Sequence, residues 1–378
     1  MRIAIVTETW RPYTDGVVTR LVATVRELRR RQHEVLVIAP RGGEADFDGA
    51  TVRGVPTFSV PFVYGGRPWG IPLPRVRRYL RDFRPDVVHV VNPIMLGIAG
   101  VTAAVSQGVP LVTSYHTNVG KYASYYHLGW LRPVIRFAEW LLHRRAAVSL
   151  ATSAAACAEL REREFLRVRL WRRGVDLKLF NPARRARREG PINGYPVPGT
   201  PVTVLYVGRL AEEKDLHRLE SLALSDEGMH LKLVGDGPAG RQLRQRFAGG
   251  PVTFTGELFG DDLADAYADA DVFVFPSTTE TLGLVLLEAL ASGLPVVAPD
   301  TPVSREILGD CPACQFFPVD DPGSIPTLIK ELLDRAPSSE LGRAARREVE
   351  SWSWEEATAQ LVEYYEEARA SHRPSRGG

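Results

Sequence analysis

The fold is decided by residues 272–298, which read VFVFPSTTETLGLVLLEALASGLPVVA. Val272–Phe275 predicts a strand, Leu284–Ser292 a helix and Pro295–Ala298 a second strand. Neither strand alternates apolar with polar residues, which is typical of strands that helices cover on both faces. The stretch therefore predicts one strand–helix–strand unit of a parallel sheet.

The same alternation continues on both sides of this unit. Further strands are expected at Ile3–Thr7, Val35–Ala39, Val87–Val91, Leu111–Tyr115, Val148–Thr152, Val168–Leu170, Val202–Val207, His230–Val234 and Val252–Thr255. Further helices are expected at Val17–Arg31, Arg75–Phe83, Ile94–Val105, Leu131–Arg145, Leu216–Leu224, Gly240–Phe247, Asp262–Ala268, Ser324–Leu333 and Trp354–Ala368. Alternating strands and helices form right-handed crossovers, so we expect doubly wound α/β domains.

A membrane span has to be considered at Val87–Gly120, which contains no Asp, Glu, Lys or Arg. A span needs about 20 consecutive apolar residues. Asn92, Pro93 and Pro110 interrupt the stretch. We therefore interpret it as strand, buried helix and strand of an α/β core.

The chain of 378 residues is long enough for two domains, since a domain takes roughly 150 residues. Asn181–Thr200 is rich in Pro, Gly and Arg and has no hydrophobic period, so it is the expected linker region. We expect an N-terminal domain over residues 1–182, a C-terminal domain over 183–353 and a last segment, 354–378, that is mainly helical. The composition, with 44% hydrophobic and 24% charged residues, excludes a disordered chain.

Three cysteines indicate a reducing compartment and no disulfide framework. Met1 and Arg2 lead directly into a strand pattern, so no secretory signal is expected and the localisation expected is cytoplasmic. The pair Cys311 and Cys314 has no matching Cys or His pair, so a metal site there is not expected.

The net charge of +2 hides an asymmetry along the chain. Residues 1–182 hold 27 Lys and Arg against 14 Asp and Glu, a net of +13, and residues 183–378 hold 20 against 31, a net of −11. The basic half is expected to face an anionic partner, the alternative being attraction between the domains. No nucleic-acid partner is expected, because interleaved aromatic residues and a recognised binding motif are missing.

Ligands of doubly wound domains bind at the carboxyl ends of the strands, so the loops there carry the candidate sites. In the first loop, Gly16 precedes a helix and its backbone N–H groups are suited to an anion. The alternative is a simple helix cap by Thr14 or Asp15.

The segment Gly235-Asp236-Gly237-Pro238-Ala239-Gly240 fits the G-x-G-x-x-G fingerprint of dinucleotide-binding turns. A nicotinamide-dependent oxidoreductase is therefore an alternative function. The motif follows the second strand of its domain, whereas the fingerprint follows the first. Pro238 is also explained as a proline at the start of a helix.

A better anion site follows the first strand of the same half. Arg209 and Lys214 are two cations five residues apart on one loop, which suits the clamping of a diphosphate. The alternative is a solvated loop, since Glu212 and Glu213 lie between them.

The second part of this site surrounds the start of the helix at Leu284. Glu280 ends the loop, and Gly283 and Leu284 open the helix, whose free N–H groups attract phosphate. Glu288 lies eight residues after Glu280, where a carboxylate suits a ribose. The alternatives are a helix-capping Glu280 and a buried Glu288 that needs a hydrogen-bonding partner.

With Gly208-Arg209 and Lys214 upstream, the E-x7-E spacing from Glu280 to Glu288 resembles retaining glycosyltransferase family 4. The resemblance covers nearly the whole chain. It includes the loop at Gly16, Ser114–Thr117, Arg173–Asp176, Gly235–Gly237 and Ser292–Val297. It implies the GT-B fold, an α/β architecture of two facing Rossmann-like domains with a cleft between them and a last helix crossing back to the N-terminal domain.

The resemblance also implies roles for single residues. Arg209 and Lys214 would bind the donor diphosphate, Glu288 the ribose, Glu280 the transferred sugar, and His116 would lie beside that sugar. The catalytic residues expected are therefore His116, Glu280, Arg209 and Lys214. Donor binding is also expected of Gly16, Gly235, Leu258, Phe259, Thr281, Leu282, Gly283, Leu284 and Glu288. The family's first loop often has two consecutive glycines, and here Asp15-Gly16 stands instead.

Ser114–Asn118, Tyr122, Tyr125-Tyr126 and Leu170–Asp176 look most like lipid-directed members of the family, such as sulfoquinovosyl diacylglycerol synthase and GDP-mannose-dependent phosphatidylinositol mannosyltransferases. The resemblance implies hexosyl transfer from a UDP- or GDP-sugar to a lipid hydroxyl. A soluble sugar or polysaccharide acceptor is the alternative. The donor phosphate itself would help deprotonate the acceptor, so neither a side-chain base nor a metal is expected. The basic half and the apolar, basic helix Leu131–Arg145 favour a peripheral site on an anionic membrane.

Overall fold

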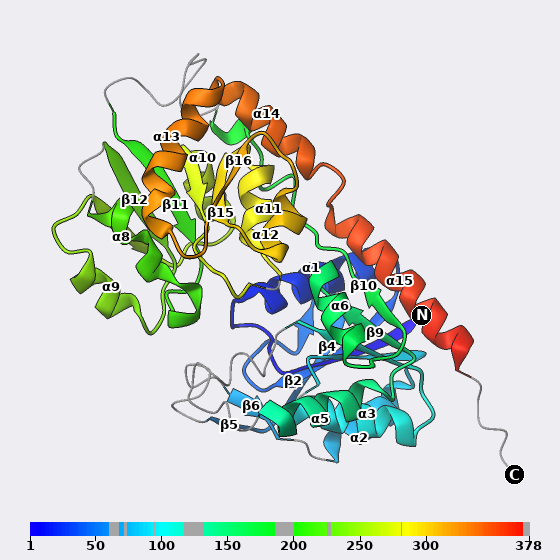
Figure 1. Ribbon diagram of the computed structural model, residues 1–378. Coiled ribbons are helices and arrows are strands. Elements are labelled where there is room, and N and C mark those ends of the chain that lie inside the picture. The colour runs from blue at the N-terminus through cyan, green and yellow to red at the C-terminus, as the bar shows by residue number, and fades with distance from the viewer. Residues whose placement is uncertain are drawn as a thin grey trace, which may run out of the picture. The chain divides into compact units, whose positions relative to one another are not determined.

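The computed structural model describes residues 1–59, 68–71, 74–93, 95–116, 132–185, 200–224, 228–280 and 282–372. The chain forms two compact units (Figure 1). The first comprises Met1–Arg173 and Trp354–Gly378, and the second comprises Gly174–Ser353. Each unit contains one large sheet with helices packed on it.

The first unit is built on an eight-stranded sheet in the order β10-β9-β8-β7-β1-β2-β4-β3. These strands are β1 (Arg2–Thr7), β2 (Glu34–Pro40), β3 (Asp46–Phe47), β4 (Ala50–Val55), β7 (Val87–Val91), β8 (Leu111–Tyr115), β9 (Val148–Ala151) and β10 (Val168–Leu170). All neighbours pair in parallel except β3, which is antiparallel to β4. A separate antiparallel pair joins β5 (Thr57–Ser59) to β6 (Pro68–Gly70).

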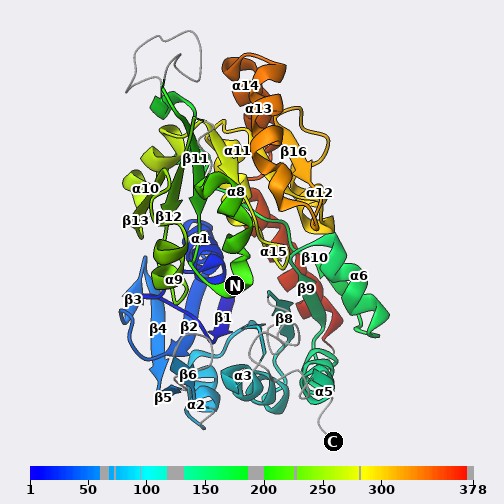
Figure 2. The ribbon, with the colours of Figure 1, turned by 60° about the vertical axis from the view of Figure 1, so that its left-hand side comes forward.

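Helices cover both faces of this sheet, as the continuous apolar strands predict. Ile3 and Ile5 of β1 pack in one core with residues of α1 (Gly16–Arg30) and α15 (Trp354–Ser371). Ala4 and Val6 point to the other face, where α2 (Arg75–Phe83) and α3 (Met95–Ser106) lie. Figure 2 shows α2, α3 and α5 (Arg132–His143) together on one side of the sheet. In the same unit, α6 (Ala154–Glu162) packs beside β9 and β10.

The second unit has a six-stranded parallel sheet in the order β13-β12-β11-β14-β15-β16. The strands are β11 (Val202–Val207), β12 (Met229–Val234), β13 (Val252–Gly256), β14 (Val272–Val274), β15 (Val296–Pro299) and β16 (Cys314–Phe317). Its α-helices include α8 (Glu220–Ala223), α9 (Gly240–Arg246), α10 (Gly260–Ala268), α11 (Leu284–Ala291), α12 (Pro302–Leu308), α13 (Ile325–Arg335) and α14 (Ser338–Glu348). Short 3₁₀ turns lie at Glu212–Lys214, Leu216–Leu219 and Pro322–Ser324.

The first boundary between the units lies at Arg173–Gly174, earlier in the chain than the expected boundary at residues 182–183. The reason is that the chain after Gly174 already packs in the second unit. The N–H of Val175 donates to the carbonyl of Trp352 over 2.8 Å, and the ring of Phe180 packs edge-on against Tyr267. The second boundary, at Ser353–Trp354, leaves α15 packed against α1 in the first unit.

The uncharged stretch at Val87–Gly120 forms β7, α3 and β8, so the prediction of strand, helix and strand is confirmed for the residues that are described. Among the helices of the described segments, none combines the length and the apolar character that crossing a bilayer requires. Residues 186–199, the greater part of the expected linker, lie outside the described residues.

Candidate functional site

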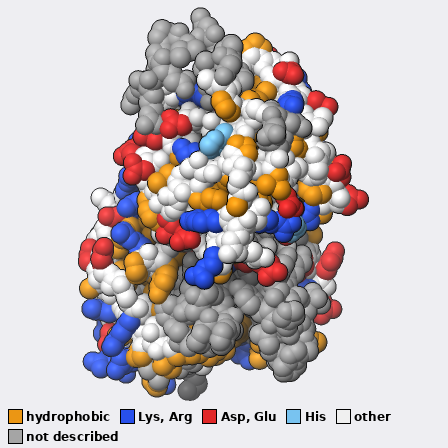
Figure 3. Space-filling view, turned by 90° about the vertical axis from the view of Figure 1, so that its left-hand side faces the viewer, with side chains coloured by type: hydrophobic (Ala, Val, Ile, Leu, Met, Phe, Trp, Pro, Cys, Tyr) orange, Lys and Arg blue, Asp and Glu red, His pale blue; other side chains and the backbone are white. Residues whose placement is uncertain are grey.

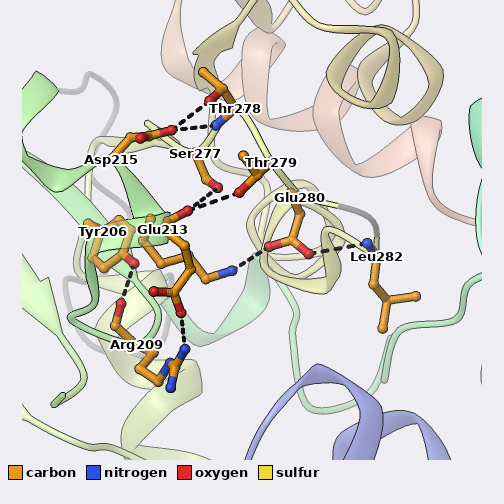
Figure 4. Close-up of polar contacts among 10 residues, drawn as sticks. Tyr206, Arg209, Glu213, Asp215, Ser277, Thr278, Thr279, Glu280 and Leu282 are labelled. Carbon is orange, nitrogen blue, oxygen red and sulfur yellow. Dashed lines mark hydrogen bonds and ion pairs between the residues drawn. The ribbon is translucent and has the colours of Figure 1, made fainter. Parts of the chain in front are cut away.

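Two loops of the second unit meet at the carboxyl edge of its sheet, because they follow the neighbouring strands β11 and β14 (Figure 4). The Thr279 hydroxyl donates to the backbone carbonyl of Glu213 over 3.0 Å. The carboxylate of Asp215 accepts from both the N–H and the hydroxyl of Thr278, at 2.9 and 2.7 Å. These bonds lock the loop that carries Arg209 and Lys214 to the loop that carries Glu280.

Both cations of the first loop are paired with carboxylates. The Arg209 guanidinium contacts the carboxylate of Glu213, and the Nζ atom of Lys214 lies 2.7 Å from Glu280 Oε2. Burial lowers the pKa of Lys214, but the adjacent Glu280 carboxylate more than offsets it and the pKa is raised overall. Lys214 therefore stays protonated beside Glu280.

Glu213 does not fit the alternative of a solvated loop. It is buried beside Arg209, whereas Glu212 is exposed. The spacing of four residues between Arg209 and Glu213 was the available signal.

The start of α11 is shaped by Gly283, which caps the helix with a φ of 61°. This positive φ is what favours glycine here, since the nearest atom to a Cβ would be the end of the Ile307 side chain, Cδ1, at 2.6 Å. The N–H of Leu282 donates to Glu280 Oε1 over 3.2 Å, and Leu284 begins the helix. Glu280 thus lies at the helix N-terminus, while Thr281 lies outside the described residues.

Glu288 lies on α11 and has a protein partner that sequence reasoning missed. The hydroxyl of Tyr267, on α10, donates to Glu288 Oε2 over 2.8 Å. Desolvation by burial raises the pKa of Glu288 to about 7, although the Tyr267 bond acts against this rise. No sequence signal links the two residues, because they lie on different helices.

The glycines of the G-x-G-x-x-G segment have a packing explanation. A Cβ atom on Gly235 would lie 2.0 Å from the Gly208 carbonyl oxygen, and one on Gly237 would lie 2.5 Å from that of Leu210. The Gly235 N–H also donates to Gly256 over 2.7 Å. Gly235 therefore holds the loops after β11, β12 and β13 close together.

The expected base-facing segment lies after β13. Leu258 is half-buried, and Phe259, just before α10, is 55% exposed. An exposed aromatic ring at a carboxyl edge is available for stacking.

In the first unit, His116 follows β8 and is buried. Its Nε2 atom lies 2.9 Å from Ser114 Oγ, and its N–H donates to Asn92 Oδ1 over 2.7 Å. Burial, with Arg20 and His89 nearby, holds the pKa of His116 well below its usual value, so the ring is neutral.

Gly16 is the first residue of α1, and Asp15 caps the helix, as one of the two alternatives for this loop predicts. Asp15 Oδ1 accepts from the N–H groups of Val17 and Val18, both at 2.9 Å. The Asp15 carboxylate thus accepts from two of the N–H groups at this terminus.

The loop after β1 forms a small pocket lined by Glu8, Thr9, Trp10, Arg11, Tyr13, Pro40 and Arg41. Glu8 accepts backbone hydrogen bonds from Leu96 and Gly97 at the start of α3. Desolvation raises the pKa of Glu8 to about 7. The carboxyl of Glu8 thus joins this loop to α3.

Cys311 and Cys314 are both buried and are not joined in a disulfide. Across the described segments, no three His, Cys, Asp or Glu side chains lie together in a way that would hold a metal ion. Tyr122, Tyr125 and Tyr126, which the resemblance to lipid-directed members includes, lie outside the described residues.

Comparison with known proteins agrees with this geometry. Residues 14–179 match the sequence model of Glycosyltransferase Family 4, and residues 201–335 match that of Glycosyl transferases group 1. The GDP-mannose-dependent alpha-mannosyltransferase of Mycolicibacterium smegmatis is 38% identical over 380 residues, covering 97% of each chain. The sulfoquinovosyl transferase of Arabidopsis thaliana is 36% identical and covers 92% of this chain and 70% of that one.

Solved structures agree on the fold. HepE of Anabaena, in complex with UDP and glucose, has a TM-score of 0.76 at 19% identity and covers 97% of this chain and 99% of that one. Sucrose-phosphate synthase of Thermosynechococcus elongatus has a TM-score of 0.74 at 21% identity, covering 98% of this chain and 100% of that one.

The two sheets and the loops at their edges define a glycosyltransferase of the GT-B fold. The chain belongs to glycosyltransferase family 4. The nicotinamide alternative at Gly235–Gly240 is therefore wrong, and the close loop packing explains those glycines.

Proposed function

We propose that the chain transfers a hexose from a UDP- or GDP-sugar to a hydroxyl group of a membrane lipid, with retention of the anomeric configuration. The observation that carries the donor side is the cluster of Arg209, Lys214, Glu280 and the start of α11 on two interlocked loops. Relatives at 38% and 30% identity are named as GDP-mannose-dependent mannosyltransferases.

Each group at the cluster has a distinct task in this proposal. Arg209 and Lys214 neutralise the diphosphate, and the N–H groups at the start of α11 add to the same field. Glu280 holds hydroxyls of the transferred sugar, and Glu288 accepts from the ribose beside Tyr267. Phe259 and Leu258 lie against the base, Gly235 shapes the loop, and His116 contacts the sugar.

The charge of the leaving diphosphate is met by these fixed cations, so the reaction proceeds without a divalent ion. The donor phosphate itself accepts the proton of the acceptor hydroxyl on the same face. Preorganised charges of this kind act where negative charge develops, and they stabilise the transition state more than the ground state.

Support for a lipid acceptor comes from the names of relatives. One is a phosphatidylinositol dimannoside mannosyltransferase at 30% identity, and another is the alpha-monoglucosyldiacylglycerol synthase of Streptococcus pneumoniae at 24%. The first unit holds the acceptor in this proposal, beside the loop that carries Glu8 and Arg11.

An anionic membrane surface is the proposed docking partner of the first unit. That unit holds 29 Lys and Arg against 18 Asp and Glu, and the second holds 18 against 27. On the face shown in Figure 3, basic and acidic side chains are intermixed. Net charge alone therefore does not define a docking face.

The docking element proposed is α5 with the two arginines that follow it. Phe137 is 62% exposed and stacks on Trp140, and the Arg144 guanidinium lies over the Trp140 ring. Leu141 and Arg145 are also exposed. Apolar and basic groups on one amphipathic helix are typical of an interfacial helix, and the proposed site is the inner, cytoplasmic face of the cell membrane.

The test is a transfer assay with GDP-mannose, UDP-glucose and UDP-sulfoquinovose as donors. Acceptors are phosphatidylinositol and diacylglycerol in vesicles, and free inositol and glycerol in solution. We expect product with one lipid acceptor and an α-linkage by NMR. A β-linked product, or equal rates on the soluble acceptors, would contradict the proposal.

A further inference from the structure

Four buried side chains of the first unit form a hydrogen-bonded chain that ends at His116. Tyr365 on α15 lies 2.8 Å from Nδ1 of His89 on β7. His89 Nε2 lies 2.9 Å from Ser114 Oγ on β8, and Ser114 Oγ lies 2.9 Å from His116 Nε2. All four side chains are at most 2% exposed, so water does not compete for these bonds.

The direction of the chain follows from counting its protons. Among the described residues, the Tyr365 hydroxyl bonds to His89 only. If that hydroxyl accepted a proton from His89, its own hydrogen would be buried without an acceptor, which is costly. Tyr365 therefore donates to His89 Nδ1.

The middle of the chain then has one arrangement. Burial, with Arg20 nearby, lowers the pKa of His89 to about 3, so the ring is neutral and carries one proton. Since Nδ1 accepts from Tyr365, that proton is on Nε2 and is donated to Ser114 Oγ. Ser114 has one hydroxyl hydrogen and donates it to His116 Nε2.

We propose that Tyr365, acting through His89 and Ser114, fixes the tautomer of His116 with its ring proton on Nδ1. Tyr365, His89 and Ser114 are positioning residues, since they act only through His116. The inference rests on the proposed function in one respect, which is that His116 contacts the donor sugar. With its proton on Nδ1, the buried His116 ring carries a hydrogen-bond donor at that atom, and a sugar hydroxyl oxygen is able to accept from it.

Trp171 keeps the two imidazole rings from turning over. Its indole packs edge-on against His89 and against His116, with centroids 5.5 and 5.6 Å away. The indole N–H donates to the Ala357 carbonyl at the start of α15 over 3.2 Å, and Arg20 lies over the ring. The returning helix therefore supplies both the proton donor and the anchor of the indole.

The test is a nitrogen-15 NMR experiment on histidine-labelled protein, which distinguishes the two neutral tautomers by their ring nitrogen shifts. The chain has 8 histidines, and spectra of His116→Gln and His89→Gln assign the two rings. We expect His116 protonated on Nδ1 and His89 on Nε2. The reverse assignment of either ring would overturn the proposal without any substrate being present.

The variant Tyr365→Phe removes one hydroxyl, and Tyr364→Phe is its matched control. Tyr364 lies on the same helix but donates to the Leu170 carbonyl over 3.0 Å, so it is not one of the four hydrogen-bonded side chains that end at His116. Tyr365→Phe is expected to release His116 into a mixture of tautomers, and Tyr364→Phe to leave the spectrum unchanged. An unchanged His116 tautomer in folded Tyr365→Phe would contradict the role of Tyr365.

Kinetics separate this inference from the proposed function. Tyr365→Phe should lower kcat about two- to ten-fold, the loss of one neutral hydrogen bond, with the donor KM unchanged. If both histidine tautomers are as proposed and kcat of Tyr365→Phe stays at the wild-type value, the proposed contact of His116 with the sugar is wrong, but the proposed tautomer of His116 stands. If the tautomers are reversed, the proposal for Tyr365, His89 and Ser114 is wrong whatever the kinetics.

Discussion

The ammonium of Lys214 lies 2.7 Å from the carboxylate of Glu280, although the two residues come from loops after different strands. Both side chains are about one-fifth exposed, at 20% and 18%. Lys214, proposed to bind the diphosphate, and Glu280, proposed to bind the sugar, thus form an ion pair with each other. Removal of either one leaves a largely buried charge.

This pair predicts strong coupling in a double-mutant cycle with Lys214→Met and Glu280→Gln. Each single change strands the other charge, whereas the double change does not, so the losses in unfolding free energy should be non-additive by about 0.5–3 kcal/mol. Urea denaturation measures this. The exposed pair Arg246 and Glu220, 2.6 Å apart, is the control and should couple less. Equal coupling in both pairs would contradict the prediction.

Glu280 and Glu288 are predicted to differ in their kinetic effects. Glu288→Ala should raise the donor KM, and Glu280→Ala should mainly lower kcat. The rise in KM and the fall in kcat should each be about ten- to a hundred-fold, which corresponds to the free energy of one charged hydrogen bond. Steady-state kinetics with varied donor measure both. Glu212→Ala, on the same loop as Arg209 but exposed, is the control. Near-normal kinetics in both variants would show that the assignment is wrong.

Stability should depend on pH through Glu8 and Glu288, because burial raises the pKa of each from 4.5 to about 7. The folded state binds these protons more tightly than the unfolded state, so their contribution is lost as pH rises from 4.5 through 7. Buried His89 and His143, with pKa values lowered to about 3, act in the opposite sense below pH 6.5. Because these opposite contributions overlap, the quantity to measure is the difference in unfolding free energy between a carboxyl variant and the wild-type protein.

The double variant Glu8→Gln, Glu288→Gln isolates this contribution. Its unfolding free energy relative to wild type should rise between pH 5 and pH 8, as measured by urea denaturation. Glu212→Gln is the control and should show no such trend. A pH-independent difference would mean that the two carboxyls titrate normally.

The proposed membrane contact predicts that Phe137→Ser weakens binding to phosphatidylglycerol vesicles. A phenyl ring that enters the bilayer interface contributes about 1.5–3 kcal/mol, so binding should fall about ten-fold or more. Leu166→Ser is the matched control, since Leu166 is 65% exposed in the same unit but lies outside α5. Co-sedimentation at low and high salt measures both the apolar and the electrostatic parts. Equal losses for the two variants would place the contact elsewhere.

The strands in the centre of each sheet are predictable from the sequence, because a short continuous apolar run is typical of a strand that helices cover on both faces. Strand β4, next to the edge of the first sheet, and the edge strand β16 are not, since Thr51 and Arg53 break the apolar run of β4 and β16 is only Cys314–Phe317. The helices α6, α12 and α14 were also missed, because α6 and α14 mix Ala, Arg and Glu without a long apolar stripe and α12 has only 7 residues. Local pattern therefore fails where tertiary contacts supply the stability.

The site shows the same division. Arg209, Lys214, Glu280 and Glu288 stand out because their spacing around two loops is visible in the sequence. The cap of α1 by Asp15 is a local contact, and the sequence offered it as one of two alternatives. The partner of Glu288 is less visible, because Tyr267 reaches it from another helix. That contact depends on three-dimensional placement that spacing along one chain does not encode.

The most direct test is calorimetric titration of GDP and UDP into the protein in buffer with EDTA. The account predicts that one nucleotide binds without a metal, and that Arg209→Ala and Lys214→Ala each weaken it about ten- to a hundred-fold, whereas Glu212→Ala does not. Binding that disappears in EDTA and returns with magnesium or manganese, or that survives in both cation variants, would contradict it.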